Sequence, residues 1–143
     1  MVTEHAEYRY WLPVYPVQAI FLAGMVPLFL GATISDIAYM KSAHIQWNNF
    51  ASWLIVGGLI VSAVALVLAI VDLARHPRRS RHHGIYTLLL LATWIVGFFN
   101  ALMHARDAWA SMPSGLVLSV ITTLLACAAT WFGFYAPRTG VIK

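Results

Sequence analysis

The chain has 143 residues, of which 61% are hydrophobic and only 10% are charged. Soluble globular domains carry about 25% charged residues, so this composition excludes an ordinary water-soluble fold. It predicts a single membrane domain over residues 1–143. The formal net charge of +4 does not indicate nucleic acid, because the basic residues gather in the expected connections between helices, where they act on lipid and topology.

The first expected membrane segment covers residues 12–38 and ends in a polar connection at 41–48. The second, residues 50–73, contains the run ASWLIVGGLIVSAVALVLAIVDL, which has no charge before Asp72. About 20 apolar residues at about 1.5 Å each span the hydrocarbon core of a bilayer. Small residues lie at helical spacing on one face of this run, so the face should pack closely on other helices: Gly58, Ser62, Ala65 and Ala69.

Two further apolar segments follow the Arg-rich connection at residues 74–84. They cover residues 85–103 and 114–135, and a second polar turn at 105–113 separates them. Short connections join neighbouring helices, so the simplest architecture is an all-α integral membrane fold. We expect an antiparallel four-transmembrane-helix bundle with up-down-up-down topology.

Basic residues are unevenly shared between the two sides of this bundle. The side that holds both termini carries Arg9, Arg75, Arg78, Arg79, Arg81, Arg138 and Lys143, whereas the other carries Lys41 and Arg106. Loops rich in Lys and Arg stay in the cytoplasm. The sequence therefore predicts a multi-pass protein of the bacterial inner membrane with cytoplasmic N- and C-termini.

Histidine is the first residue type that could hold a cofactor, because paired imidazoles bind b-type haem in membranes. His83 and His104 lie at opposite ends of the third segment, roughly 31 Å apart along a helix, so they cannot hold one iron. His44 lies in a turn on the side of His104. The partners available to His83 lie in polar segments: His5, His76 and His82. A haem-binding electron-transfer protein is therefore the alternative, and histidines bonded to nearby carboxylates are favoured.

Two carboxylates lie near the ends of apolar helices, where a charge is costly unless it is paired or protonated. We expect Asp36 to pair with His104, and Asp72 to pair with His83 or Arg75. These pairs would form polar clusters at opposite ends of the bundle.

A polar stripe runs along the third segment and continues the cluster around His104: Thr93, Gly97, Asn100 and His104. Such a seam could bind a quinone head group or pass protons, and it could equally only fasten helices together through hydrogen bonds. The candidate cofactor-binding residues are His104, His83, Asn100 and His44, with quinone or haem b as the candidate cofactors. No continuous proton path is expected, because residues 60–71 and 87–92 are almost wholly apolar.

Motifs of catalysis and metal binding are absent from the sequence. There is no Gly-rich phosphate loop, no His-Glu-x-x-His and no nucleophile elbow, so we expect no catalytic activity. A single cysteine, Cys127, cannot build a disulfide framework or a Cys-ligated metal site. We expect it to be a buried small residue.

Several stretches carry a resemblance to a known family. They are TISDIAY (33–39), WNNFASWLIVGGLIVSAVALVLAIVDL (47–73), the pair His83-Gly84, and LSVITTLLACAATWFGF (118–134). Over about residues 12–136 the chain resembles the bacterial membrane proteins grouped as domain of unknown function 2231. Family members often carry His-Pro steps at the start of the first span, whereas this chain keeps only the prolines, Pro13 and Pro16. By position, the resemblance therefore extends to Asp36, Asp72 and His83. It implies no haem or metal role that depends on the missing histidines.

The same resemblance suggests a redox setting, because such proteins commonly occur beside or fused to Rieske, c-type cytochrome and quinoprotein dehydrogenase modules. It implies an accessory or anchor subunit for a periplasmic redox protein, with a quinone-binding groove as a further expectation. Association of this kind is not a physical derivation. The small-residue faces and the aromatic turns at Trp47 and Trp109 also suggest a partner, either another protein or a second copy. A transporter is disfavoured by the apolar middle of the segments.

Overall fold

The computed structural model describes residues 16–75, 81–106 and 108–135. These residues form four α-helices and one short 3-10 helix: α1 (Pro16–Ser42), α2 (Ile45–Arg75), α3 (Arg81–His104), η1 (Ala108–Ser111) and α4 (Ser114–Tyr135). All four α-helices are long and apolar enough to cross a membrane. The predicted all-α membrane class is confirmed.

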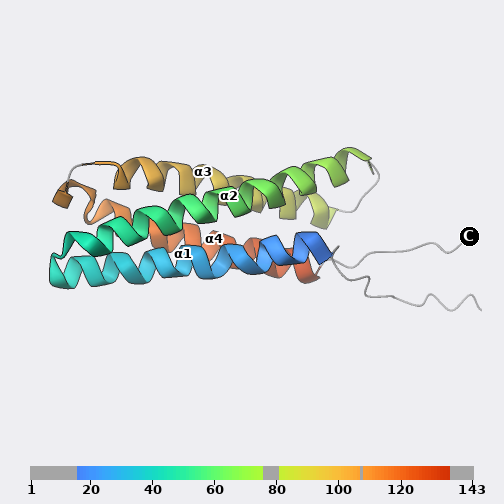
Figure 1. The fold of residues 1–143 in the computed structure, drawn as a ribbon. Coiled ribbons are helices and arrows are strands. Elements are labelled where there is room, and N and C mark those ends of the chain that lie inside the picture. Colours follow the sequence, from blue (N-terminus) through green and yellow to red (C-terminus); the bar gives the residue numbers. More distant parts are fainter. Residues whose placement is uncertain (1–15, 76–80, 107, 136–143) are drawn as a thin grey trace, which may run out of the picture.

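The four helices lie side by side, and successive helices run in opposite directions (Figure 1). α1 packs against α2 and α4, and α3 packs against the same two helices, so the bundle is antiparallel and up-down-up-down. We call the end that carries residues 43–44 and 105–113 the turn end. The opposite end, where α1 begins and α4 finishes, is the terminal end.

Two connections are shorter than the sequence predicted. α1 continues to Ser42 and α2 begins at Ile45, so the expected polar connection at 41–48 reduces to Ala43 and His44. Ala43 adopts the left-handed conformation, with φ 55°, and its N–H donates to the carbonyl of Tyr39 at 2.8 Å. This conformation is a common way to end a helix, and it reverses the chain within two residues.

The Arg-rich connection is also shorter, because α3 begins at Arg81 rather than at residue 85. Its first turn therefore includes His82 and His83, which the sequence placed in a loop. Residues 76–80 lie outside the described residues.

The small residues that were expected to form packing faces are used inside the bundle. A Cβ at Gly58 would lie 2.7 Å from Cε1 of Phe29, and one at Gly133 would lie 2.8 Å from Cδ1 of Leu22. Ala65 and the other small residues of the α2 face are also buried. These faces pack the four helices of the bundle against one another. The prediction that they indicate a separate partner was therefore wrong.

Large apolar side chains cover the outside of the bundle, as a lipid environment requires. Examples with more than half of their surface exposed are Ile20, Trp53, Ile60, Leu88, Leu124 and Trp131. Cys127 is also exposed, so the prediction that it is buried was wrong. Its neighbours Ala126 and Ala129 take the inward positions of that turn of α4, which leaves position 127 facing outward.

Apolar side chains from all four helices fill the middle of the bundle. This core consists of Leu22, Met25, Phe29, Ala65, Leu66, Ala69, Tyr86, Leu90, Ala126 and Ala129. It separates the polar groups of the turn end from those of the terminal end.

Candidate functional site

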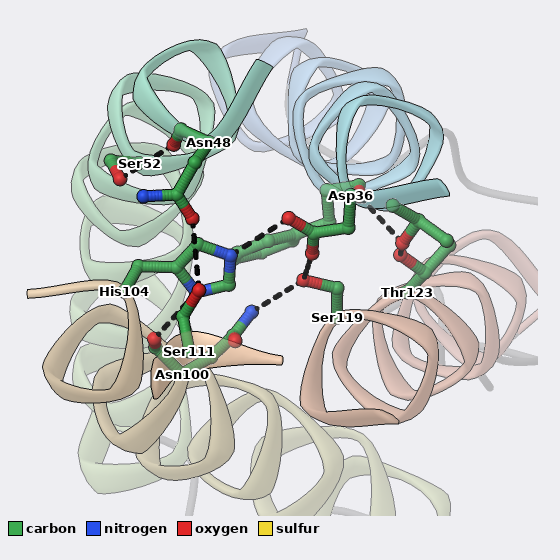
Figure 2. Close-up of polar contacts among 10 residues, drawn as sticks. Asp36, Asn48, Ser52, Asn100, His104, Ser111, Ser119 and Thr123 are labelled. Carbon is green, nitrogen blue, oxygen red and sulfur yellow. Dashed lines mark hydrogen bonds and ion pairs between the residues drawn. The ribbon is translucent and has the colours of Figure 1, made fainter. Parts of the chain in front are cut away.

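The centre of the turn end is Asp36 of α1, whose side chain is fully buried. Its Oδ1 lies 2.8 Å from Nε2 of His104 on α3. Its Oδ2 accepts a hydrogen bond of 2.5 Å from the hydroxyl of Ser119 on α4. One carboxylate thus joins three helices, and the pairing with His104 is the one that the sequence predicted (Figure 2).

The hydrogen bonds of His104 show how protons are arranged around this pair. Nδ1 lies 3.0 Å from the backbone carbonyl of Asn100, which can only accept, so Nδ1 must donate. A second proton lies between Nε2 and Oδ1 of Asp36. Whether that proton lies on nitrogen or on oxygen, the pair has no net charge, which removes most of the cost of burying an isolated carboxylate.

The side chain of Asn100 extends the same network. Its Nδ2 donates to Oγ of Ser119 at 2.8 Å, and the hydroxyl of Ser119 donates to Asp36. The other amide atom, Oδ1 of Asn100, is buried and accepts no hydrogen bond from the described residues. An unsatisfied buried acceptor costs about 1–3 kcal/mol, so this atom is a place where a water molecule would be stabilising.

Two smaller links fasten the turn end around this network. Oγ of Ser111 in η1 donates to Oδ1 of Asn48 on α2 at 3.1 Å. The hydroxyls of Thr33 on α1 and Thr123 on α4 lie 2.9 Å apart. With the Asp36 network, these bonds connect all four long helices at one level of the bundle.

A cavity of about 500 Å³ opens at the turn end beside the network. It is lined by Ile45, Gln46, Asn48, Asn49, Ser52, His104, Ala105 and Arg106. Among these described residues, Arg106 is the only permanently charged side chain and none is a carboxylate. The sequence did not reveal this site, because its polar residues come from both expected turns and looked like ordinary solvated connections.

The terminal end has its own ion pair. Nε2 of His83 lies 2.8 Å from Oδ2 of Asp72, and the two side chains are 6% and 13% exposed. Of the two partners predicted for Asp72, His83 therefore makes this contact, while Arg75 is exposed at the last position of α2. Nearby, Nε2 of Gln18 on α1 donates to the hydroxyl of Tyr86 at 2.8 Å.

The remaining predicted site residues do not join these clusters. Thr93 is fully buried, but its hydroxyl donates to the carbonyl of Leu89 in its own helix at 2.7 Å. His44 is exposed in the turn between α1 and α2 and has no part in the network around His104. The polar seam on α3 therefore ends at Asn100 and does not reach the middle of the membrane.

Comparison with protein families matches residues 14–139 to a family described as "Predicted membrane protein (DUF2231)". The chain belongs to this family. Comparisons with curated proteins and with solved structures gave no match. Membership in this family confirms the resemblance noted in the sequence and, with the four candidate spans, establishes a membrane protein.

The environments of His83 and His104 do not fit a haem. Both ring nitrogens of His104 are engaged, and a Cβ at Gly115 would lie 2.9 Å from its Cε1, so the ring packs directly on α4. Nε2 of His83 is held by Asp72. In the three described stretches of the chain, no group of three or more His, Cys, Asp or Glu side chains could hold a metal ion.

The seam on α3 does not fit a quinone head group either. Thr93 and Asn100 are fully buried, and the bundle around them is filled by packed side chains. A head group could enter there only if the helices separated. A quinone site in this chain must therefore lie elsewhere on the bundle.

Proposed function

We propose that this protein is a non-catalytic accessory subunit of the bacterial inner membrane, which anchors a redox partner at its turn end. The observation that carries the proposal is that Asp36, which is fully buried, and Asp72, which is 13% exposed, are both already bound by imidazoles of α3. Asp36 is held by His104 and Asp72 by His83, so each pair fastens two helices. Both ring nitrogens of His104 are engaged and its pair with Asp36 is buried, so this pair supports a scaffold and not acid–base chemistry on a substrate.

The turn end offers a surface on which a partner could bind. Its exposed aromatic side chains are Trp47, Phe50, Trp53 and Trp109. Such residues are enriched at protein interfaces and also at the membrane surface. The unequal distribution of basic residues in the sequence favours cytoplasmic termini, so the turn end would face the periplasm. The redox character of the partner rests on the modules that occur beside similar proteins.

Co-purification from the native bacterium tests the anchoring role. The tagged chain is extracted in a mild detergent, and bound proteins are identified by mass spectrometry. We expect a redox protein to co-purify with the unaltered chain and with Trp131→Ala, an exposed aromatic at the other end of the bundle. The redox protein should not co-purify with the double variant Trp47→Ala/Trp109→Ala. Recovery of a lone monomer, or of a partner without a redox group, would contradict the proposal.

The proposed orientation has a separate test. Two single-cysteine variants, His44→Cys and His82→Cys, are made in a Cys127→Ala background. Cells with a permeabilised outer membrane and an intact inner membrane are then treated with a maleimide that does not cross membranes. Both positions are exposed and lie at opposite ends of the bundle. We expect labelling at 44 and none at 82 until the cells are broken. The reverse pattern would place the termini in the periplasm.

A quinone site is a second candidate function, favoured by a shallow apolar groove between α1 and α4. The groove has a volume of about 370 Å³ and is lined by Val26, Cys127, Thr130, Trp131, Phe134 and Tyr135. The rings of Trp131 and Tyr135 stack with centroids 5.8 Å apart and nearly parallel planes, at 10°. An aromatic, lipid-facing groove of this kind suits a prenylated ring that arrives from the bilayer.

Two measurements on the purified protein test the cofactor alternatives. Quinone extracted with the protein should fall in Trp131→Leu and stay in Trp53→Leu, which alters an equally exposed Trp outside the groove. Equal quinone content in both variants would exclude the groove. For haem, we expect the absorption spectrum of the purified protein to lack a Soret band. A Soret band that is present in the unaltered protein and lost in His104→Ala would instead support haem binding.

A further inference from the structure

The cavity at the turn end is lined mainly by groups that donate hydrogen bonds. Gln46, Asn48 and Asn49 contribute amide side chains, and Arg106 contributes a guanidinium. In the part of the lining that the structure describes, no Asp or Glu opposes them. Amides can donate or accept, so the guanidinium supplies the one permanent charge of the described lining, and this positive charge favours an anionic ligand.

Asn48 provides the strongest indication that a ligand belongs in this cavity. Its side chain is only 7% exposed, and its Oδ1 accepts the hydrogen bond from Ser111. That bond fixes the orientation of the amide and turns Nδ2 to the opposite side (Figure 2). Nδ2 donates to none of the residues that the structure describes, although Asn48 lines the cavity. Nδ2 is therefore a donor of fixed orientation at the wall of the cavity, where an acceptor bound in the cavity could reach it.

The position of the cavity at the start of α2 also favours an anionic ligand. Ile45 and Gln46, the first two residues of α2, form part of its wall. The N-terminus of a helix carries a partial positive charge and exposes N–H groups that have no partner within the helix. Arg106, which follows the end of α3, lines the same cavity, and its Nη1 lies 3.6 Å from Sδ of Met103.

We infer that this cavity is a binding site for a phosphate group, held by Arg106, by Nδ2 of Asn48 and by the first turn of α2. A phosphate is tetrahedral and accepts hydrogen bonds from several directions, which matches donors that come from two helices. The buried carboxylate of Asp36 does not oppose this, because His104 lies between it and the cavity and neutralises it. The inference concerns the isolated chain and does not depend on the proposed redox partner.

Two sources could supply the phosphate group. The ends of membrane-spanning helices lie at the depth of the lipid head groups, where phosphodiesters are abundant. The exposed side chain of Ile45 at the edge of the cavity would then contact the glycerol or an acyl chain. The other source is free phosphate from the adjoining aqueous phase.

Binding to the purified chain tests the inference. Native mass spectrometry in a phosphate-free detergent counts bound phosphatidylglycerol, with diacylglycerol as the lipid that lacks the phosphate, and calorimetry follows inorganic phosphate. We expect Arg106→Gln and Asn48→Asp each to weaken binding by about tenfold. Asn48→Asp keeps the acceptor for Ser111 and replaces the free donor with a carboxylate oxygen, which also repels a phosphate. Lys41→Gln removes the permanent positive charge near the α1–α2 turn, which is not part of the described lining, so it should leave binding within about twofold.

The results of these measurements distinguish lipid phosphate from free phosphate, and they can also contradict the inference. Binding of phosphatidylglycerol alone, sensitive to Arg106 and Asn48, assigns the site to a lipid head group. Inorganic phosphate that binds with the same sensitivity assigns it to free phosphate. The inference is wrong if neither probe binds, if diacylglycerol binds equally well, or if Lys41→Gln weakens binding as much as Arg106→Gln. Circular dichroism and thermal unfolding of each variant identify any loss that results from misfolding.

Discussion

Gly115 of α4 lies directly against the imidazole of His104. A Cβ at position 115 would be 2.9 Å from Cε1 of that ring, which is closer than side chains normally approach. The missing side chain therefore lets α3 and α4 come close enough for His104 to reach Asp36 while Ser119 reaches it from the other side.

This contact makes Gly115→Ala a sensitive probe of the Asp36 network. We expect a loss of about 1–3 kcal/mol in the free energy of unfolding, although alanine is the better helix former, because the added methyl displaces a packed ring. Thermal unfolding in detergent measures the effect. Gly84→Ala is the matched control, because a Cβ there has nothing within 4 Å. If both variants are equally stable, the close packing of His104 on α4 is not a constraint.

The two Asp–His pairs should differ in their contribution to stability. The side chains of His104 and Asp36 are 1% and 0% exposed, whereas those of His83 and Asp72 are 6% and 13% exposed. We expect His104→Ala to cost roughly 2–4 kcal/mol, because it leaves a deeply buried carboxylate that must take up a proton. His83→Ala should cost less, because water reaches Asp72 more easily.

A double-mutant cycle with Asp36→Ala and His104→Ala measures the pair itself. We expect a coupling energy of about 0.5–3 kcal/mol, as is usual for residues in direct contact. The combination of Asp36→Ala with His83→Ala is the control, and its effects should add because these residues lie at opposite ends of the bundle. Additive effects for Asp36 and His104 would contradict the hydrogen bond between them.

Adjacent glycines on α2 test the packing of the core. A Cβ at Gly58 would lie 2.7 Å from Cε1 of the buried Phe29, whereas one at Gly57 would make an ordinary contact of 3.6 Å with Leu28. Gly58→Ala should destabilise the bundle by about 1–3 kcal/mol through overpacking. Gly57→Ala should be neutral or stabilising by up to about 1 kcal/mol, because alanine favours the helix. Equal unfolding temperatures for the two variants would exclude the assigned orientation of α2.

The outward orientation of Cys127 can be checked against its neighbour Ala126. Ala126 is fully buried and Cys127 is exposed, although both lie on the same turn of α4. We expect Cys127→Leu to change the free energy of unfolding by less than about 0.5 kcal/mol. Ala126→Leu should cost about 1–3 kcal/mol, because no space is left for the larger side chain. Similar costs for both would mean that position 127 is also packed inside the bundle.

Much of the fold followed from local patterns in the sequence. The face of α2 that includes Gly58, Ser62, Ala65 and Ala69 was predicted from helical spacing, and these residues are buried. The pairing of Asp36 with His104 also followed, because a carboxylate inside a membrane bundle needs a partner and this histidine lies at the same depth. Cys127 was predicted wrongly, because an apolar run does not show which of its residues face lipid.

The remaining parts of the candidate site depend on helix pairing that local patterns do not show. Ser119 lies within an apolar run of the sequence, yet its hydroxyl donates a hydrogen bond to Asp36. Asn48 and Arg106 were assigned to polar turns, and their common cavity arises because the start of α2 lies beside the end of α3. No pattern within either segment indicates that contact.

The order of the amino acids was enough to establish four membrane-crossing helices, their inward faces and the need to pair each buried acid. These properties follow from hydrophobicity and helical periodicity, which act over a few turns of one helix. The details of the turn end required all four helices in place. Several contacts there join residues that are far apart in the chain and that only helix packing brings together. They are the hydrogen bonds from Ser119 and Ser111, the contact of His104 with Gly115, and the cavity beside Arg106.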